Sequence, residues 1–210
     1  MSRSEWTWGE EAANTLSHGI GLVGAIAMAP ILIVGAVGRG TAADIVGASI
    51  FAASLILLYM ASTLYHGVRP GRWKQLLRRF DHAAIFVLIA GTYTPFTLGV
   101  LRGGWGWALF GVIWGVAVVG IASKLVQGIR GRALSTALYV VMGWLVVVAI
   151  QPVLARVPLP GVLWLVAGGL FYSAGVLFYT RPTRYAHAIW HVFVLAGSVC
   201  HVVSVLGWAV

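Results

Sequence analysis

The sequence predicts an all-α protein, a bundle of seven transmembrane helices with its N-terminus in the cytoplasm and its C-terminus outside. Of the 210 residues, 60% are apolar and only 9% are charged, whereas an ordinary soluble domain carries about 25% charged residues. The mean hydropathy is +0.93, so lipid must be the solvent for most of the surface. Seven helices of about 20 residues would use roughly 140 residues. Residues 1–210 are therefore expected to form a single transmembrane domain.

Seven apolar runs in the sequence are long enough to cross a bilayer. Turn-forming or charged segments separate them, for example Gly38-Arg39-Gly40 and Arg181-Pro182. The expected spans cover residues 14–37, 43–67, 80–100, 104–124, 133–155, 161–179 and 185–207. Pro95 falls inside the third span and is expected to kink it, because proline lacks a backbone N–H.

The distribution of lysine and arginine between alternate loops predicts the orientation, because short basic loops stay on the cytoplasmic side. Eleven of the fourteen basic residues fall on one side: Arg3, Arg69, Arg72, Lys74, Arg78, Arg79, Lys124, Arg130, Arg132, Arg181 and Arg184. Only Arg39, Arg102 and Arg156 fall on the other side. A count of six helices would disturb this alternation, so the asymmetry also supports seven.

Composition excludes several classes of protein. The formal charge of +9 would suggest a nucleic-acid partner for a soluble protein, but here the basic residues lie between apolar runs, so none is expected. The only cysteine, Cys200, rules out an intrachain disulfide and a cysteine-rich metal site. The early glutamates Glu5, Glu10 and Glu11 do not fit the basic start of a cleavable signal peptide, so the first helix is expected to be retained.

Ionisable side chains within the expected spans are the first functional candidates, because each costs several kcal/mol inside a bilayer. They are His18, His66, Asp81, His82, His187, His191 and His201.

His187 and His191 are four residues apart, which places both imidazoles on one face of a helix, one turn apart. This spacing is common in helices that bind a single metal ion. His66 lies at the inner end of the second span and Asp81 at the inner start of the third. All four residues are therefore expected within roughly 10 Å of the cytoplasmic boundary. They share one site if their helices pack together; hydrogen bonding between helices is the alternative role for the histidines.

Three neutral imidazoles with an open fourth position form a ligand set used by catalytic zinc. Asp81 is the only acidic residue expected at this depth, so it is the candidate to accept or orient a proton of the metal's water. Ser62, four residues before His66, has two interpretations: an oxyanion-stabilising hydroxyl or a helix serine bonded to its own backbone. His82 points about 100° away from Asp81 and is expected at the cytoplasmic interface with a structural role.

Three further polar residues are expected to have structural roles. His201 lies about 15 Å further along its helix than His191, too far to share the same ion. It is expected to hydrogen-bond between helices, with Ser198 or His18 as partners. Asn14 and His18 are four residues apart at the start of the first span and are expected to form a structural polar pair.

Several of these stretches together resemble the hemolysin III family, which belongs with the progestin and adiponectin receptors in a wider group that includes the alkaline ceramidases. The stretches are Glu11-x-x-Asn14-x-x-Ser17-His18-Gly19, Ser62-x-x-x-His66, Phe80-Asp81-His82, Gly91-Thr-Tyr-Thr-Pro95 and His187-x-x-Trp190-His191, followed by Gly197-Ser198 and His201. The resemblance covers nearly the whole chain. It implies a multi-pass protein of a bacterial-type inner (plasma) membrane, with Zn²⁺ held by His66, His187 and His191. It also implies that Asp81 and Ser62 lie beside the metal's water.

Three functions fit this combination of features. The first is a zinc-dependent membrane hydrolase that acts on a lipid amide, such as a ceramide-like substrate. The second is a sensor or regulator of the lipid state of the membrane, in which the zinc is structural. The third is a haemolysin-like pore or proton-conducting protein with a histidine relay. Membrane lipids are the expected partners in each case.

Reporter fusions test the predicted topology. A reporter inserted at Gly71 should be active in the cytoplasm, and one fused after Val210 should be active outside, because the basic loops are retained inside. Finding both ends of the chain on one side of the membrane would contradict a seven-helix topology.

Overall fold

The structure is a computed structural model that describes residues 6–127 and 132–209. Within these ranges, seven helical segments are long and apolar enough to cross a membrane, which confirms the predicted fold class. Three positions used for the topology prediction, Arg3, Arg130 and Val210, lie outside the described residues. The side of the membrane that each end faces stays a prediction.

The seven spans are built from eight α-helices and two short segments of other helix types within the described ranges. They are α1 (Trp8–Arg39), α2 (Ala42–Gly67), α3 (Arg72–Pro95) with the π-helix η1 (Phe96–Val100), α4 (Gly104–Gln127), α5 (Arg132–Gly143) with the 3-10 helix η2 (Leu145–Ala149) and α6 (Ile150–Arg156), α7 (Leu159–Tyr179) and α8 (Ala186–Trp208).

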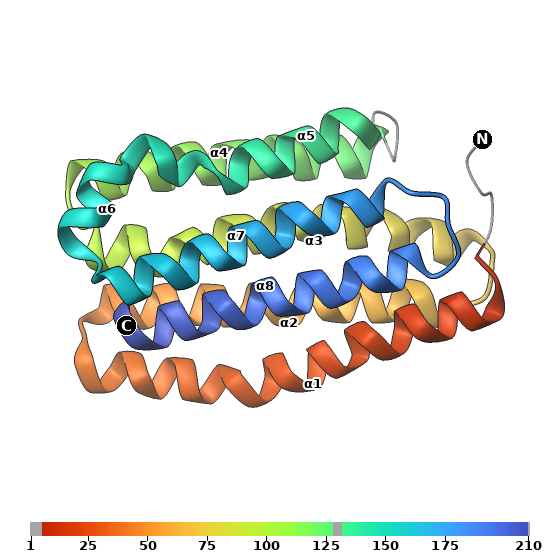
Figure 1. The fold of residues 1–210 in the computed structure, drawn as a ribbon, viewed down its shortest axis with the longest axis horizontal. Helices are drawn as coiled ribbons and strands as arrows, with labels where there is room; N and C mark the ends of the chain where they lie inside the picture. The colour runs from red at the N-terminus through yellow and green to blue at the C-terminus, as the bar shows by residue number, and fades with distance from the viewer. Residues whose placement is uncertain (1–5, 128–131, 210) are drawn as a thin grey trace.

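The helices run side by side along the long axis of the molecule (Figure 1). Helix α2 packs between α1 and α3, α8 packs against α7 and α1, and α4 packs against α3. Helix α5 touches α3, α4 and α7 only over short stretches. Helix α1 begins at one end of the bundle and α8 finishes at the opposite end (Figure 1), as an odd number of spans requires.

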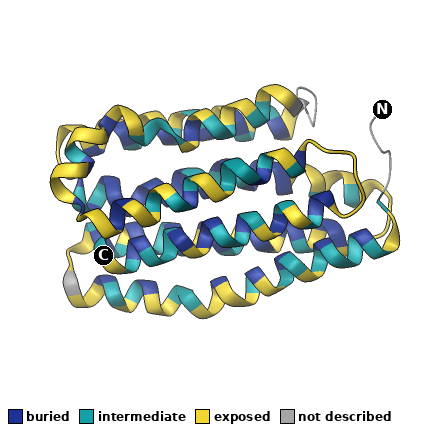
Figure 2. Cartoon of the chain, viewed as in Figure 1, coloured by how far each residue is buried: buried dark blue, intermediate teal, exposed yellow. Residues whose placement is uncertain are grey.

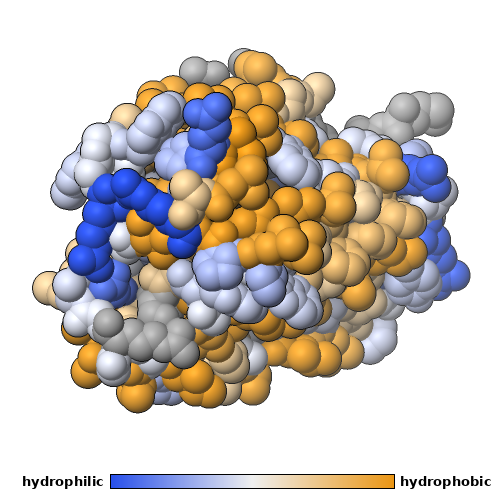
Figure 3. Space-filling view, turned by 60° about the vertical axis from the view of Figure 1, so that its left-hand side comes forward, coloured by the Kyte–Doolittle hydropathy of each residue, from blue (hydrophilic) through white to orange (hydrophobic). Residues whose placement is uncertain are grey.

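The surface of the bundle suits a hydrocarbon solvent. Exposed residues run along the outward faces of the helices and buried ones along the inward faces (Figure 2). Many of the exposed side chains are large and apolar, among them Val34, Val119, Leu134 and Leu177. Figure 3 shows apolar side chains across most of one face, with hydrophilic residues gathered toward the ends. An apolar surface of this extent is typical of a membrane-embedded protein.

Helix α1 begins at Trp8, ahead of the span expected from residue 14. The cause is a capping box, in which the Thr7 hydroxyl oxygen accepts the Glu10 N–H at 3.3 Å while the Glu10 carboxylate accepts the Thr7 N–H at 3.0 Å. The earlier start makes Glu11 helical and places it two turns before His18, on the same face of α1. This extra stretch of helix reaches the candidate site described below.

The third span changes helix type where Pro95 was expected to kink it. Helix α3 ends at Pro95 and the backbone continues as the π-helix η1 instead of entering a loop. Because proline cannot donate a backbone hydrogen bond, the chain widens locally at this point.

The fifth span was expected to be continuous over residues 133–155, but it is interrupted after Gly143. At the break, the Tyr93 hydroxyl donates to the carbonyls of Met142 and Gly143 at 3.0 and 2.8 Å and accepts the N–H of Val146 at 3.0 Å. Backbone groups freed within a bilayer need such partners, because no water can satisfy them there. A single side chain from α3 therefore stabilises an interruption that apolar composition alone does not reveal.

Candidate metal centre

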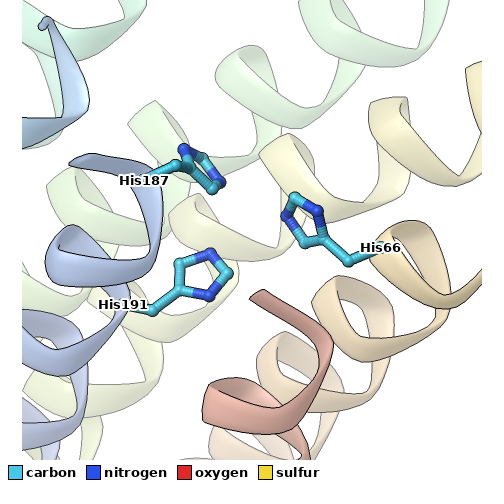
Figure 4. A group of neighbouring side chains, drawn as sticks. All are labelled: His66, His187 and His191. Carbon is cyan, nitrogen blue, oxygen red and sulfur yellow. The ribbon is translucent and has the colours of Figure 1, made fainter. Parts of the chain in front are cut away.

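Three histidines from distant parts of the sequence converge at one end of the bundle (Figure 4). His66 lies in the last turn of α2, while His187 and His191 lie in the first two turns of α8. All three are buried, and one ring nitrogen of each lies within 4.8 Å of the other two. Imidazole nitrogens are ligands for zinc and other transition metals. The three histidines could therefore hold one metal ion.

Helix α1 supplies the hydrogen bonds that orient two of the three rings. The Nδ1 atom of His66 lies 2.6 Å from Oε2 of Glu11. The Nδ1 atom of His191 lies 3.3 Å from the carbonyl oxygen of Asn14 and 3.0 Å from Oγ of Ser17. Because an ionised carboxylate and a carbonyl only accept hydrogen bonds, each Nδ1 carries the proton and donates it. The Nε2 atom of each ring is then left with a lone pair.

These two lone pairs fit a metal ion. The Nε2 atoms of His66 and His191 are buried and have no hydrogen-bond partner among the described residues. Leaving a buried polar atom unsatisfied costs about 1–3 kcal/mol. Metal-binding histidines commonly donate Nδ1–H to a carboxylate or a backbone carbonyl while Nε2 faces the metal. The hydrogen bonds from α1 select the form of each ring that can bind a cation.

The ring of His187 is packed among aromatic side chains. Its centroid lies 4.9 Å from that of Trp6, 5.0 Å from that of Trp190 and 4.6 Å from that of His191. These rings shield the third histidine from water. A shielded site strengthens the electrostatic interactions within it.

The expectation that Asp81 is the only acidic residue at this depth is wrong, because α1 begins early enough to bring Glu11 to the site. The second oxygen of Glu11, Oε1, lies 2.8 Å from Nζ of Lys74 on α3. The Lys74 ammonium also donates to two backbone carbonyls at the end of α2. Glu11 is thus held between a cation on α3 and the imidazole of His66 on α2.

Ser62 hydrogen-bonds to another helix, since its Oγ lies 2.7 Å from Nδ1 of His18 on α1. The ring of His18 in turn stacks on that of His191, with centroids 3.5 Å apart and an angle of 8° between the planes. His18 therefore connects Ser62 to a histidine of the candidate centre. Asn14 and His18 were expected to pair with each other, but each contacts the histidines of the centre instead.

Asp81 lies on α3 and is buried, with 7% of its surface exposed. It lines a cavity of about 120 Å³ between α3, α5, α7 and α8. His18 lines the same cavity, so the cavity adjoins the stacked rings of His18 and His191. Most of the other lining side chains are apolar or aromatic. The structure thus brings Asp81 to a hollow beside the three-histidine group.

The two remaining histidines make contacts between helices. His82 is buried; its Nδ1 lies 2.7 Å from the carbonyl oxygen of Arg78 and its Nε2 lies 3.3 Å from the hydroxyl of Tyr179 on α7. Its position at the cytoplasmic interface stays a prediction. In His201, Nε2 lies 3.2 Å from the carbonyl oxygen of Leu165 on α7. His201 therefore bonds between helices as expected, although its partner is a backbone carbonyl and not a side chain.

Four residues that contact the candidate centre or its neighbours had no predicted site role: Glu11, Asn14, Ser17 and Lys74. A pattern was nevertheless present, because Glu11, Asn14 and His18 are spaced i, i+3 and i+7 and so share one face of a helix. Lys74 belongs to a run of basic residues that the positive-inside rule already explains. Nothing in the sequence distinguishes Lys74 from the other basic residues of this run. Its ion pair with Glu11 was therefore not predictable.

Fold and site together define a multi-pass membrane protein with a buried three-histidine group at one end of a seven-helix bundle. The family model described as haemolysin-III related matches residues 6–202, and the chain belongs to this family. It is 44% identical to the Hemolysin-3 homolog of Bacillus subtilis (strain 168) over 202 residues, which are 96% of this chain and 95% of the relative. It is also 44% identical to Hemolysin-3 of Bacillus cereus over 190 residues, 90% of this chain and 87% of the relative.

A more distant similarity extends to animals. The chain is 28% identical over 212 residues to the human Monocyte to macrophage differentiation factor, with 91% of this chain and 81% of that protein covered. The seven apolar helices and the two similar Bacillus proteins identify this chain as a multi-pass bacterial membrane protein.

The hydrogen bond from Glu11 to His66 generates a prediction for metal affinity. Glu11→Gln keeps all three imidazoles but loses the charged acceptor that orients one of them, so it should weaken Zn²⁺ binding by about 10- to 100-fold. His191→Ala leaves two ligands and should abolish stoichiometric binding. Competition of the purified proteins with a chelating metal indicator measures both effects.

Asp44→Asn serves as the matched control. Asp44 is also a buried carboxylate, but it pairs with Arg102 at the opposite end of the bundle. Its removal should leave metal affinity unchanged. Wild-type affinity in Glu11→Gln, or a full complement of metal in His191→Ala, would contradict the assignment.

Proposed function

We propose that this protein is a zinc-dependent membrane hydrolase that acts on a lipid amide, with His66, His187 and His191 as the zinc ligands. The observation that carries the proposal is the position of the three-histidine group beside a mainly apolar cavity that Asp81 lines. Such a hydrolase needs a metal site and an adjoining apolar hollow, and here His18 contacts both.

The donor set suits zinc. Three imidazoles without a thiolate match catalytic zinc sites that keep a fourth position open. Zinc bound in this way supplies an activated water molecule and polarises a carbonyl group. The buried Nε2 lone pairs of His66 and His191 support the fit, since they have no partner among the described residues.

Asp81 is the proposed proton acceptor. Its carboxylate lines the cavity, where the carbonyl of a bound lipid would lie, and it is buried enough to exclude bulk water. A buried carboxylate that accepts a proton from the attacking water becomes neutral, which relieves the cost of its burial. The Ser62 hydroxyl, fixed by its hydrogen bond to His18, would help to hold the reacting carbonyl.

The cavity offers room for a lipid chain. It lies between α3, α5, α7 and α8, and its mainly apolar and aromatic lining suits a hydrocarbon chain. A second hollow on the outer surface between α5 and α7 shares Thr136, Val140 and Val176 with the cavity. These shared walls favour entry of the substrate sideways from the bilayer. The short contacts of α5 with its neighbours suit such a path.

Two other functions use the same features differently. In a sensor of the lipid state the lipid would bind in the cavity without being hydrolysed, and the metal would hold α2 and α8 together. The names of the two Bacillus relatives, Hemolysin-3 homolog and Hemolysin-3, suggest a haemolysin. A wide pore needs polar residues along its whole length, and the mainly apolar lining of the cavity counts against one.

Asp81→Asn separates a catalytic metal from a structural one. The substitution removes the proton acceptor but no metal ligand, so metal content should stay at the wild-type level while hydrolysis falls by at least about 100-fold. The measurement is release of free fatty acid from a panel of lipid amides and esters by purified protein in detergent. Wild type, Asp81→Asn and His191→Ala are compared at equal folded concentration.

Asp44→Asn is again the control and should hydrolyse the substrate at the wild-type rate. Activity that survives in both Asp81→Asn and His191→Ala would show that a contaminating enzyme is responsible. A wild-type protein that contains zinc but hydrolyses nothing in the panel would overturn the hydrolase and favour the sensor.

A further inference from the structure

Toward the end of the cavity away from the candidate metal centre, a buried polar atom has no hydrogen-bond partner among the described residues. The Nδ1 atom of His201 is buried and has no hydrogen-bond partner among the described residues. His201 is one of the side chains that line the cavity. Burial of an unsatisfied acceptor is unfavourable, so its retention needs a reason.

The protonation state of this ring follows from its contact with α7. Nε2 lies 3.2 Å from the carbonyl oxygen of Leu165, which can only accept, so Nε2 carries the proton. The Nε2–Cδ2 edge also packs against Gly168, where a side chain would collide with it. Nδ1 is the ring atom opposite that edge. It therefore carries a lone pair and faces away from the α7 backbone.

The neighbouring polar groups cannot satisfy it, because they already have partners. Thr92 donates to the Leu88 carbonyl, Tyr93 donates to the Met142 and Gly143 carbonyls, Trp144 donates to Ser173, and Tyr172 bonds to Ser198. The lone pair on His201 Nδ1 can therefore accept a hydrogen bond from a ligand, whereas these neighbouring polar groups of the cavity wall already have hydrogen-bond partners.

The distance from this acceptor to the candidate metal centre follows from the positions of the two groups on α8. His201 follows His191 by ten residues on α8, which is about 15 Å along the helix axis. Asp81 and Thr92, on the opposite wall, are separated by a similar length of α3. An extended hydrocarbon chain covers this distance with roughly ten to twelve carbons.

We propose that this end of the cavity binds a hydroxyl group carried on the lipid chain, about ten to twelve carbons from the carbonyl held beside Asp81. The ligand class is a long acyl chain with a hydroxyl near its middle. The acceptor requires a hydrogen-bond donor, and the apolar surroundings disfavour a charged one. Hydroxyl groups next to the carbonyl lie too close to the metal centre to reach His201. This inference rests on the proposed lipid-binding role of the cavity.

The experiment measures binding, independently of turnover. Purified protein in detergent is loaded with a fluorescent fatty acid, which is then displaced by octadecanoic acid, 12-hydroxyoctadecanoic acid or 3-hydroxyoctadecanoic acid. The 12-hydroxy acid should displace the probe at about tenfold lower concentration than the other two, because only its hydroxyl reaches Nδ1. Equal displacement by the 12-hydroxy and unsubstituted acids would overturn the inference, as would failure of all three to bind.

Two substitutions of nearly equal shape test the role of the nitrogen. His201→Leu removes the acceptor and should abolish the tenfold preference, whereas His201→Asn keeps a polar atom near the position of Nδ1 and should retain part of it. Ser204→Ala is the matched control. It deletes another α8 to α7 hydrogen bond, from Ser204 to the Gly161 carbonyl, at a residue that does not line the cavity. Ser204→Ala should keep the preference for the 12-hydroxy acid. If His201→Leu also keeps it, the proposal is wrong.

The two proposals fail in different ways. If the 12-hydroxy preference is present but amides of these acids are not hydrolysed, the hydrolase is wrong and the hydroxyl site stands. If the amides are hydrolysed without any preference for the hydroxylated chain, the hydroxyl site is wrong and the hydrolase stands.

Discussion

The hydrogen bonds from the first turns of α1 to ring nitrogens on α2 and α8 are the constraint on which the candidate site depends. Glu11 reaches Nδ1 of His66, and the carbonyl of Asn14 reaches Nδ1 of His191. Each contact decides which ring nitrogen keeps a lone pair and where that lone pair points. The same contacts tie three helices together at one end of the bundle. The hydrogen bonds that join α1 to α2 and α8 therefore also orient the candidate metal ligands.

The bundle combines this tightly bonded end with a loosely packed side. Helix α2 packs extensively against α1 and α3, and α8 against α7 and also α1, whereas α5 contacts its neighbours over short stretches and is interrupted after Gly143. Tyr93 satisfies the backbone at that interruption and also lines the cavity. A break of this kind is tolerated in a membrane only where it is buried in protein or lines a cavity. The irregular fifth span thus accompanies the hollow that would take a lipid.

Much of the fold was predictable because membrane insertion depends on properties that are local in sequence. Run length, apolar composition and the alternation of basic loops led to seven spans, and the structure has seven. The interruption of the fifth span was not predictable in this way, since Leu145 and Val146 are as apolar in a 3-10 helix as in an α-helix. The early start of α1 was open to prediction from Thr7 and Glu10, whose spacing is that of a capping box.

The site was predictable in part for the same reason. The i, i+4 spacing of His187 and His191 is a local pattern, and the shared depth of His66 follows from topology, so the three histidines could be grouped in advance. Their hydrogen-bond partners were not identified, because Glu11 was placed outside the membrane and Lys74 was explained by loop charge. Contacts such as that of His18 with Ser62 depend on how helices rotate against one another. Neither periodicity nor hydropathy determines that rotation for a helix with few polar residues.

X-ray absorption spectroscopy at the zinc edge of the purified protein tests most directly the claim that three histidines hold a metal with an open fourth position. The expected zinc shell has three imidazole nitrogens at about 2.0–2.1 Å and one oxygen at about 2.0–2.2 Å, with no sulfur. Because the one cysteine, Cys200, lies on α8 about two and a half turns beyond His191, a sulfur ligand near 2.3 Å would place the zinc elsewhere. A shell of oxygen atoms without imidazole would equally exclude a three-histidine site.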